Sequence, residues 1–157
     1  MTGHFVLTAL DGQVVTDSTY RGKWLLVFFG YTYCPDVCPT VLGEIGNALS
    51  ALGPLAESVQ PIFITVDPAR DTAAVLMQYL KSFDRRIVGL RGAPAQLEAV
   101  AKQYHVYYKV RSLDHGEYVV DHSAFIHVVD PQGRFVKLLN GDLSGHRLAD
   151  ELRKLVN

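Results

Sequence analysis

Hydrophobic positions divide the chain into alternating strand-like and helix-like segments. The densest apolar run, residues 24–29, is rich in aromatic and branched side chains and stops at Gly30, which predicts a buried strand. After Thr40 the apolar positions recur with the spacing of one helix face, and Gly53 is suited to ending that helix. This face consists of Val41, Leu42, Ile45, Ala48, Leu49 and Leu52. A strand, a loop and a helix are therefore predicted in direct succession.

The same alternation continues to about residue 104. A second strand is predicted at residues 62–66, and Asp71 is a good N-cap for the helix that follows. A short strand near residues 88–90 precedes a helix that begins at about Pro94. The apolar faces of these two helices are Val75, Leu76, Tyr79, Leu80 and Phe83, and then Leu97, Val100, Ala101 and Tyr104. Strands that alternate with helices favour an α/β sheet with parallel strands.

Antiparallel hairpins are predicted on either side of this region. Apolar residues around Asp11-Gly12 indicate an N-terminal hairpin. Downstream, residues 106–110 and 118–120 flank a connection at 113–117, and residues 124–129 and 134–139 flank a turn at 130–133 that contains proline and glycine. A closing helix is predicted after Ser144, with Leu148, Leu152, Leu155 and Val156 on its apolar face.

A parallel βα unit followed by an antiparallel ββα unit is the thioredoxin-like plan. We therefore predict an α/β, thioredoxin-like fold with a central mixed sheet flanked by helices and an added N-terminal β-hairpin. The whole chain, residues 1–157, is expected to form a single domain, because this length suffices to bury roughly two-thirds of the unfolded surface.

Composition narrows the classes of function. With 48% hydrophobic and 20% charged residues the chain is globular, and a net charge of −1 provides no field for nucleic-acid binding. No apolar run approaches the roughly 20 residues that span a bilayer, and the first residues do not resemble a signal peptide. These observations do not exclude a membrane anchor upstream of Met1.

Both cysteines of the chain, Cys34 and Cys38, fall in the predicted loop between the strand and the helix. Pro35 and Pro39 disfavour helical backbone at the residues before them, which predicts Cys38 as the N-cap and Pro39 as the first helical residue. There the helix N-terminus would lower the pKa of Cys38 below its usual value of about 8.5. Because so short a loop gains little stability from cross-linking, we interpret the pair as a nucleophile, a redox pair or ligands for a soft metal.

If the two cysteines are metal ligands, the third ligand has to come from the six histidines. Four of them occupy positions typical of surface or locally bonded histidines: His4, His105, His115 and His146. His127 lies inside the strand predicted at residues 124–129, whereas His122 lies just before it. In a thioredoxin-like fold, the loop that enters this strand faces the cysteine loop.

Several motifs resemble those of the Sco/SenC family of copper-binding proteins. The strongest is Phe-Phe-Gly-Tyr-Thr-Tyr-Cys-Pro-Asp-Val-Cys-Pro-Thr at residues 28–40, and Val-Asp-Pro-Ala-Arg-Asp-Thr at 66–72 resembles the second motif of the family. Asp-His-Ser at 121–123 and Pro-Gln-Gly-Arg-Phe at 131–135 recur in the expected order, and the likeness covers nearly the whole chain from about Phe5. The resemblance implies a copper site made of Cys34, Cys38 and His122.

The resemblance also implies a role in assembling the dinuclear copper centre of cytochrome c oxidase. A metallochaperone of this kind would take copper from a donor protein and deliver it to the copper-receiving subunit of the oxidase. Family members are usually tethered by an N-terminal helix and face the periplasm or the mitochondrial intermembrane space. The chain shows no such tether, so we expect the domain alone, as a monomer.

The donor types suit copper in both oxidation states. Thiolates hold Cu(I), and an imidazole lets the same site accept Cu(II). Structural zinc normally takes four protein ligands, whereas three are evident here. Asp121 or the neighbouring backbone would orient His122. Asp67 is either close to the site or a turn acid beside Pro68.

Other functions use the same residues. A thiol–disulfide oxidoreductase with Cys34 and Cys38 as catalytic residues would reduce the cysteines of the copper-receiving protein, and then His122 would matter less. Peroxiredoxins place a threonine three residues before the reactive cysteine, whereas this chain has Tyr31 there. A pure interaction module would leave the cysteine loop without a purpose.

Overall fold

The computed structural model describes residues 4–34, 37–106, 108–112, 118–122 and 124–156, with Val37 and the segments 108–112 and 118–122 described by their backbone alone. Within these residues a seven-stranded mixed sheet has the order β2-β1-β5-β4-β3-β8-β9. Its strands are β1 (Val6–Ala9), β2 (Val14–Thr16), β3 (Trp24–Gly30), β4 (Val59–Thr65), β5 (Val88–Arg91), β8 (Phe125–Val129) and β9 (Phe135–Asn140). Strands β3, β4 and β5 are parallel to one another, whereas β8 pairs antiparallel with β3 and β9.

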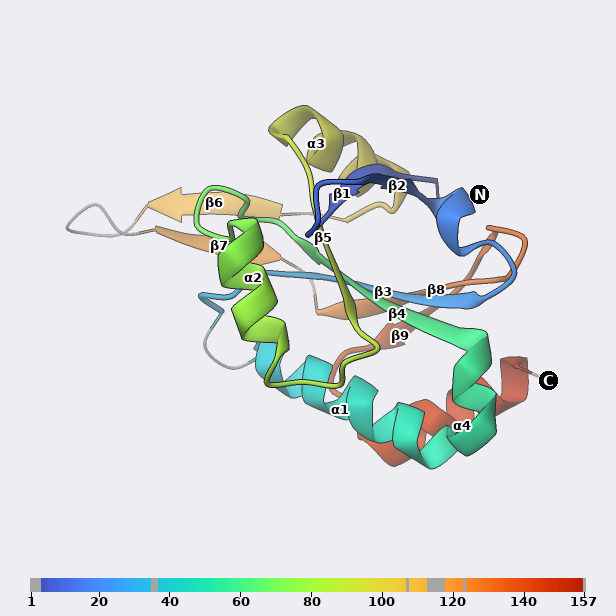
Figure 1. Cartoon of the computed structure of the whole chain (residues 1–157). Coiled ribbons are helices and arrows are strands. Elements are labelled where there is room, and N and C mark those ends of the chain that lie inside the picture. The colour runs from blue at the N-terminus through green and yellow to red at the C-terminus, as the bar shows by residue number, and fades with distance from the viewer. Residues whose placement is uncertain (1–3, 35–36, 107, 113–117, 123, 157) are drawn as a thin grey trace.

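Helices cover both faces of this sheet (Figure 1). They are α1 (Val37–Leu52), α2 (Ala73–Leu80), α3 (Pro94–Gln103) and α4 (Gly145–Leu155), with 3-10 turns η1 (Asp17–Tyr20) and η2 (Gly53–Ser58). Helices α1 and α4 lie side by side below the sheet, and α3 lies above it next to β1. This arrangement confirms the thioredoxin-like fold with an added N-terminal hairpin.

The buried run of β3 forms the centre of the core. Every residue from Leu25 to Gly30 is buried, because β3 has a strand on each side and helices over both faces. Its successive side chains point to opposite faces: Phe28 packs against Phe63 of β4, and Phe29 packs against Tyr104. Burial of each phenylalanine stabilises the fold by about 1.5–3 kcal/mol, so β3 is held firmly in place.

The predicted start of the cysteine helix is wrong by about two residues. Helix α1 already begins at Val37, so Cys38 and Pro39 are its second and third residues rather than the N-cap and first residue. The first four N–H groups of a helix have no partner within it, and proline is therefore tolerated anywhere in that turn. The predicted end is confirmed: α1 stops at Leu52, and Gly53 takes the positive φ of +59° that favours glycine.

The start of α2 also differs from the prediction. Thr72, not Asp71, is the N-cap, and its side chain accepts a hydrogen bond from the Val75 N–H. Asp71 is instead fully buried and bonded to residues of other elements. Helix α2 buries Leu76 and Leu80. Val75, predicted to belong to the apolar face, is exposed.

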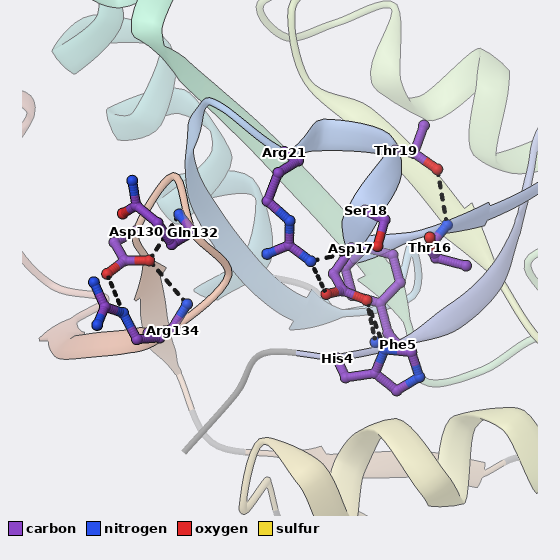
Figure 2. Close-up of polar contacts among 10 residues, drawn as sticks. All are labelled: His4, Phe5, Thr16, Asp17, Ser18, Thr19, Arg21, Asp130, Gln132 and Arg134. Carbon is purple, nitrogen blue, oxygen red and sulfur yellow. Dashed lines mark hydrogen bonds and ion pairs between the residues drawn. The ribbon is translucent and has the colours of Figure 1, made fainter.

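Polar contacts fasten the N-terminal segment at the end of β3 that lies farthest from the cysteines. Figure 2 shows the buried Asp17 carboxylate accepting hydrogen bonds from the His4 ring, the Phe5 N–H and the Arg21 guanidinium. In the turn between β8 and β9, Asp130 accepts from the backbone of two following residues. These bonds hold the segment before β3 and the β8–β9 turn in place, and pairing with β4 and β8 sets the register of β3.

A second, two-stranded sheet is formed by β6 (Tyr108–Ser112) and β7 (Tyr118–His122), which pair antiparallel with Tyr108 opposite His122. This confirms the hairpin predicted from the sequence. The predicted connection at residues 113–117 lies outside the described residues. Strand β8 begins at Phe125, three positions after β7 ends at His122.

Candidate metal centre

The two cysteines lie at the junction of β3 and α1. Cys34 belongs to a tight turn in which its N–H donates to the Tyr31 carbonyl oxygen at 3.2 Å. Cys38 lies in the first turn of α1. Both are reduced, with relative exposures of 9% for Cys34 and 0% for Cys38. Residues 35 and 36, between them, lie outside the described part of the chain.

Gly30 allows Cys38 to lie directly on the end of β3. A Cβ atom on Gly30 would lie 2.7 Å from the Cys38 Sγ and 2.9 Å from Cε2 of Phe63. Carbon atoms do not approach sulfur or an aromatic ring that closely, so any side chain here would displace one of them. The glycine that ends the hydrophobic run therefore serves a second purpose: it makes room for the sulfur.

The two sulfurs contact each other. A hydrogen bond between the Cys38 and Cys34 side chains is the largest cause of a raised pKa at Cys38, followed by burial. A backbone hydrogen bond from Tyr31 acts in the opposite direction, but it is outweighed. The low pKa expected for Cys38 is therefore wrong, because the sulfur is hydrogen-bonded to Cys34 and fully buried rather than exposed at a helix end. Without a metal, Cys38 keeps its proton.

A buried carboxylate supports the cysteine loop from the side. Asp71 is fully buried and accepts from the Thr32 N–H at 3.0 Å, the Thr32 hydroxyl at 2.5 Å and the Thr65 hydroxyl at 2.6 Å. Thr65 ends β4, and Thr32 lies two residues before Cys34. Asp71 thus joins the loop to the neighbouring strand, and its negative charge adds to the raised pKa of Cys38. The local sequence predicts only a helix cap at Asp71, because its partner Thr32 lies 39 residues away.

A second acid, Asp67, also reaches the cysteine loop through a neighbour. It is buried and pairs with Arg70 at 2.5 Å. The Arg70 guanidinium lies over the ring of Tyr33 at 4.2 Å, and Tyr33 is 62% exposed next to Cys34. Such stacking of a cation on an aromatic face is attractive, so it positions the outer side of the loop. No sequence pattern predicts the Arg70–Tyr33 contact, since cation–π partners follow no spacing rule.

The third predicted ligand comes from β7. His122 is the last residue of that strand, and the structure describes its backbone alone. The side chains of His122 and Asp121 lie outside what the structure describes. Strand β8, which follows, pairs antiparallel with β3, with Ile126 opposite Phe28. Because the strands run in opposite directions, the beginning of β8 lies near the end of β3 that carries the cysteine loop. The topology therefore brings the chain near His122 to the same edge of the sheet as the cysteines.

Among the side chains that the structure describes, no group of three or more His, Cys, Asp or Glu residues could hold a metal ion. His4 and His146 are exposed, as is His105, which agrees with their predicted surface positions. His127 is buried, 5% exposed, and its ring contacts the rings of Phe29 and Tyr104 on the sheet face opposite Phe28. It therefore belongs to the core. His115 lies outside the described residues.

Fold and site together define a class: a thioredoxin-like domain with two reduced cysteines, separated by three residues, at the strand-to-helix junction. Residues 1–157 match the family described as SCO1/SenC. The chain therefore belongs to the SCO1/SenC family, which confirms the resemblance seen in its motifs.

Named relatives extend this match. Protein SCO2 homolog, mitochondrial, from Bos taurus is 37% identical over 155 residues, which cover 97% of this chain and 58% of the relative. The chain spans about half the length of the curated relatives it matches. The structure of Bradyrhizobium japonicum ScoI with copper bound is 45% identical, with a TM-score of 0.90 and 99% of both chains covered. Yeast Sco1 with copper bound is 35% identical, with a TM-score of 0.89, over 99% of this chain and 87% of that one.

Proposed function

We propose that this chain binds copper through Cys34, Cys38 and His122 and delivers it to the dinuclear copper centre of cytochrome c oxidase. The observation that carries the proposal is the contact between the two sulfurs, which are held together at the strand-to-helix junction. The antiparallel pairing of β8 with β3 adds support, since it brings the chain near His122 to that junction. Copper is also bound in the structures of two relatives of more than 30% identity.

The chemistry of the donors suits a carrier of copper. Two sulfurs favour Cu(I), and an imidazole would let the site accept Cu(II) as well. Cys38 must lose its proton when it becomes a ligand, so uptake of the metal releases a proton. A site with three protein ligands leaves room for an incoming donor, and the ligands can then be exchanged one at a time.

Removal of single ligands tests the site. We expect Cys34→Ala, Cys38→Ala and His122→Ala each to weaken copper binding by more than the roughly 10–100-fold caused by loss of a residue that merely supports a ligand. Copper titration with a competing chelator measures this for both oxidation states. His146→Ala, which removes an exposed histidine elsewhere, is the matched control. Wild-type affinity of His122→Ala for both Cu(I) and Cu(II) would show that the third ligand is assigned wrongly.

The optical spectrum of the copper-loaded protein provides an independent check. Sulfur ligation gives Cu(II) an intense thiolate-to-copper charge-transfer band. We expect this band in the wild type and its loss in Cys34→Ala and Cys38→Ala. A Cu(II) spectrum without such a band would contradict ligation by the cysteines.

A thiol–disulfide oxidoreductase that reduces the cysteines of the copper-receiving protein is the second candidate, because the two sulfurs are reduced and in contact. Its attacking group would have to be a thiolate, and the raised pKa and full burial of Cys38 make that residue a poor nucleophile. Turnover by His122→Ala in a disulfide-reduction assay, with copper delivery intact, would favour the oxidoreductase. Loss of copper delivery would favour the chaperone.

The compartment follows from the same function. We infer that the domain works in the periplasm or in the mitochondrial intermembrane space, and the curated relatives include proteins named as mitochondrial. None of the helices in the described residues has the length and apolar character needed to cross a bilayer. Fractionation of cells that express the full-length protein, with protease added from either side of the membrane, tests which compartment the domain faces.

A further inference from the structure

An exposed aromatic side chain lies directly before one of the two cysteines. Tyr33 is 62% exposed, the highest value among the aromatic side chains that the structure describes, and it precedes Cys34 in the chain. Single exposed apolar residues are common on protein surfaces and do not by themselves mark an interface. Tyr33 differs from such residues in two ways: it is the neighbour of a proposed copper ligand, and its ring is held in place.

The ring of Tyr33 rests on a charged side chain that is itself fixed. The Arg70 guanidinium carbon lies 4.2 Å from the centroid of the Tyr33 ring and 5.8 Å from that of the buried Tyr31. The Arg70 Nε pairs with the buried Asp67 carboxylate at 2.5 Å, and the Arg70 side chain is only 18% exposed. This stack covers part of the Tyr33 ring and leaves the remainder open to solvent. A ring held in this way loses little conformational freedom when another surface packs on it.

The segment that carries Arg70 is in turn tied to the sheet. Arg91 of β5 donates to the Asp71 carbonyl oxygen at 2.7 Å and to the Pro68 carbonyl oxygen at 3.1 Å. The Asp71 N–H donates to the Asp67 carbonyl oxygen at 2.9 Å, which closes the turn between them. The support beneath the exposed ring is therefore fastened to the sheet by hydrogen bonds.

We propose that Tyr33 is a docking contact for the copper-receiving protein, which packs an apolar or aromatic side chain on the open part of the ring while copper leaves Cys34. The inference rests on the copper delivery proposed above. A thiolate of the acceptor forms a bond to Cu(I) as the Cys34–copper bond breaks, so charge and oxidation state balance. Tyr33 does not ligate the metal; it holds the acceptor beside it.

The position of the ring identifies its occupant. Neighbouring Cα atoms are only about 3.8 Å apart, so a protein that brings a ligand to the Cys34 sulfur also reaches the exposed residue before it. Tyrosine is one of the residues that most often dominate the affinity of an interface. The ring rather than the charge beneath it makes the contact, because Arg70 is already paired with Asp67 and is mostly buried.

Transfer of Cu(I) from the loaded chain to two acceptors tests this contact. One acceptor is the metal-free, reduced copper-receiving subunit, and the other is the small chelator bicinchoninate. We expect Tyr33→Ala to raise the half-saturating concentration of the protein acceptor about tenfold, as for truncation of a dominant interface residue. The chelator needs no docking surface, so the ratio of the two transfer rates removes any effect of the substitution on the copper site itself. Tyr33→Phe keeps the ring and should restore the wild-type concentration.

Val14→Ala is the matched control. Val14 is 68% exposed on the edge strand β2, which β1, β5 and β4 separate from β3. Loss of this exposed apolar side chain should leave the half-saturating concentration of the protein acceptor as in the wild type. An equal loss in Val14→Ala and Tyr33→Ala would overturn the inference, because the effect would then not depend on the cysteine loop.

Ionic strength distinguishes an apolar contact from an ionic one. The effect of Tyr33→Ala should be the same at about 0.05 M and about 0.3 M NaCl, because salt screens exposed charges and not the packing of apolar surface. An effect that vanishes at the higher concentration would show that the acceptor binds a charge such as that of Arg70. The proposed contact would then be wrong.

The remaining outcomes separate this inference from the copper site. Equal slowing of transfer to the protein and to the chelator in Tyr33→Ala would mean that Tyr33 acts on the site and not on docking. If Tyr33→Ala behaves as the wild type while His122→Ala loses Cu(I), the docking contact falls and the ligand set stands; the reverse result keeps the contact and overturns the ligand set. A wild type that takes up no Cu(I) would overturn both. A wild-type dimer in sedimentation that Tyr33→Ala dissociates would show that a second copy covers the ring, which also overturns the inference.

Discussion

The two faces of β3 carry similar aromatic clusters with very different neighbours. On one face Phe28, Phe63 and Tyr79 pack beside Cys38, and on the other Phe29 packs with Tyr104 and His127. Each cluster holds one buried polar atom without a hydrogen-bond partner among the described residues. These atoms are the Tyr79 hydroxyl oxygen and the His127 Nδ1.

The neighbours decide what such an atom can do. His127 is surrounded by the rings of Phe29, Tyr104 and Phe135, and burial alone lowers its pKa to about 4. It is a neutral core residue that no nearby event would charge. Tyr79 instead packs against Phe63 on the face that carries the Cys38 sulfur, and burial is the main cause of its raised pKa. Similar aromatic packing therefore surrounds a core imidazole on one face of β3 and a phenol on the face of the sulfur site.

The largest expected difference between the two faces is the contribution of His127 to the pH dependence of the unfolding free energy. The pKa of His127 is about 4 in the folded protein and about 6.5 in the unfolded chain, so the unfolded chain binds more protons between these values. Stability is therefore lost as pH falls from about 6.5 to 4, by about 3 kcal/mol in total. His127→Phe should lose less stability over this range, as measured by urea unfolding at pH 7 and pH 4.5.

The control for this prediction is His146→Phe, which changes an exposed histidine. Its unfolding free energy should follow pH as the wild type does. If His127→Phe lost as much stability on acidification as the wild type, the histidine would not be buried in its neutral form.

Gly30→Ala should have the next largest effect, on the face that carries the sulfurs. The new methyl group would overlap the Cys38 Sγ and the Phe63 ring, and overpacking of this kind costs about 2 kcal/mol. Copper affinity should fall as well, since Cys38 is pushed away from β3. Chemical unfolding and copper titration measure the two effects.

Gly43→Ala is its counterpart within α1, where an added Cβ meets no atom within 4 Å. That variant should be stabilised by up to about 1 kcal/mol, because alanine favours helix over glycine. Equal stability of the two variants would mean that Cys38 does not lie against Gly30.

The smallest of these effects is expected for Thr32→Val, which removes one hydrogen bond between the cysteine loop and Asp71. The backbone N–H of residue 32 still donates to the carboxylate, so we expect a loss of about 1.5 kcal/mol. Alkylation of Cys34 should become faster because the loop is held by fewer bonds. An unchanged alkylation rate would show that Asp71 does not position the cysteine loop.

Much of the fold follows from local patterns. Hydrophobic periodicity and turn chemistry act over a few residues, so they predict elements that are local. These elements are the apolar strand β3, the hairpins around Asp11-Gly12 and Pro131–Gly133, and the helix cap at Ser144. The start of α1 was predicted wrongly, since proline fits any position in the first turn of a helix and Pro39 therefore does not identify the first residue. Thr72 and Asp71 are both good caps, and contacts of Asp71 with Thr32, 39 residues away, decided between them.

The position of the cysteine pair between a strand and a helix was predictable from the sequence, whereas the pKa of Cys38 was not. The spacing of Cys34 and Cys38 indicated a reactive pair, but the raised pKa of Cys38 depends on the contact between the sulfurs and on burial, which no local pattern reports. Helical spacing placed the ring of Tyr79 in the core and gave no information about its hydroxyl. The ligand role of His122 stays a prediction, because its side chain lies outside the described residues.

The packing of α1 against α4 has a consequence for how the protein is made. The Glu44 carboxylate of α1 accepts a hydrogen bond from the Gly145 N–H, and Arg153 donates to the Ala51 carbonyl oxygen. The helix that carries Cys38 is thus braced by residues about a hundred positions later in the chain. On the ribosome the cysteines emerge long before that brace exists, so the early chain exposes two thiols that the finished protein buries.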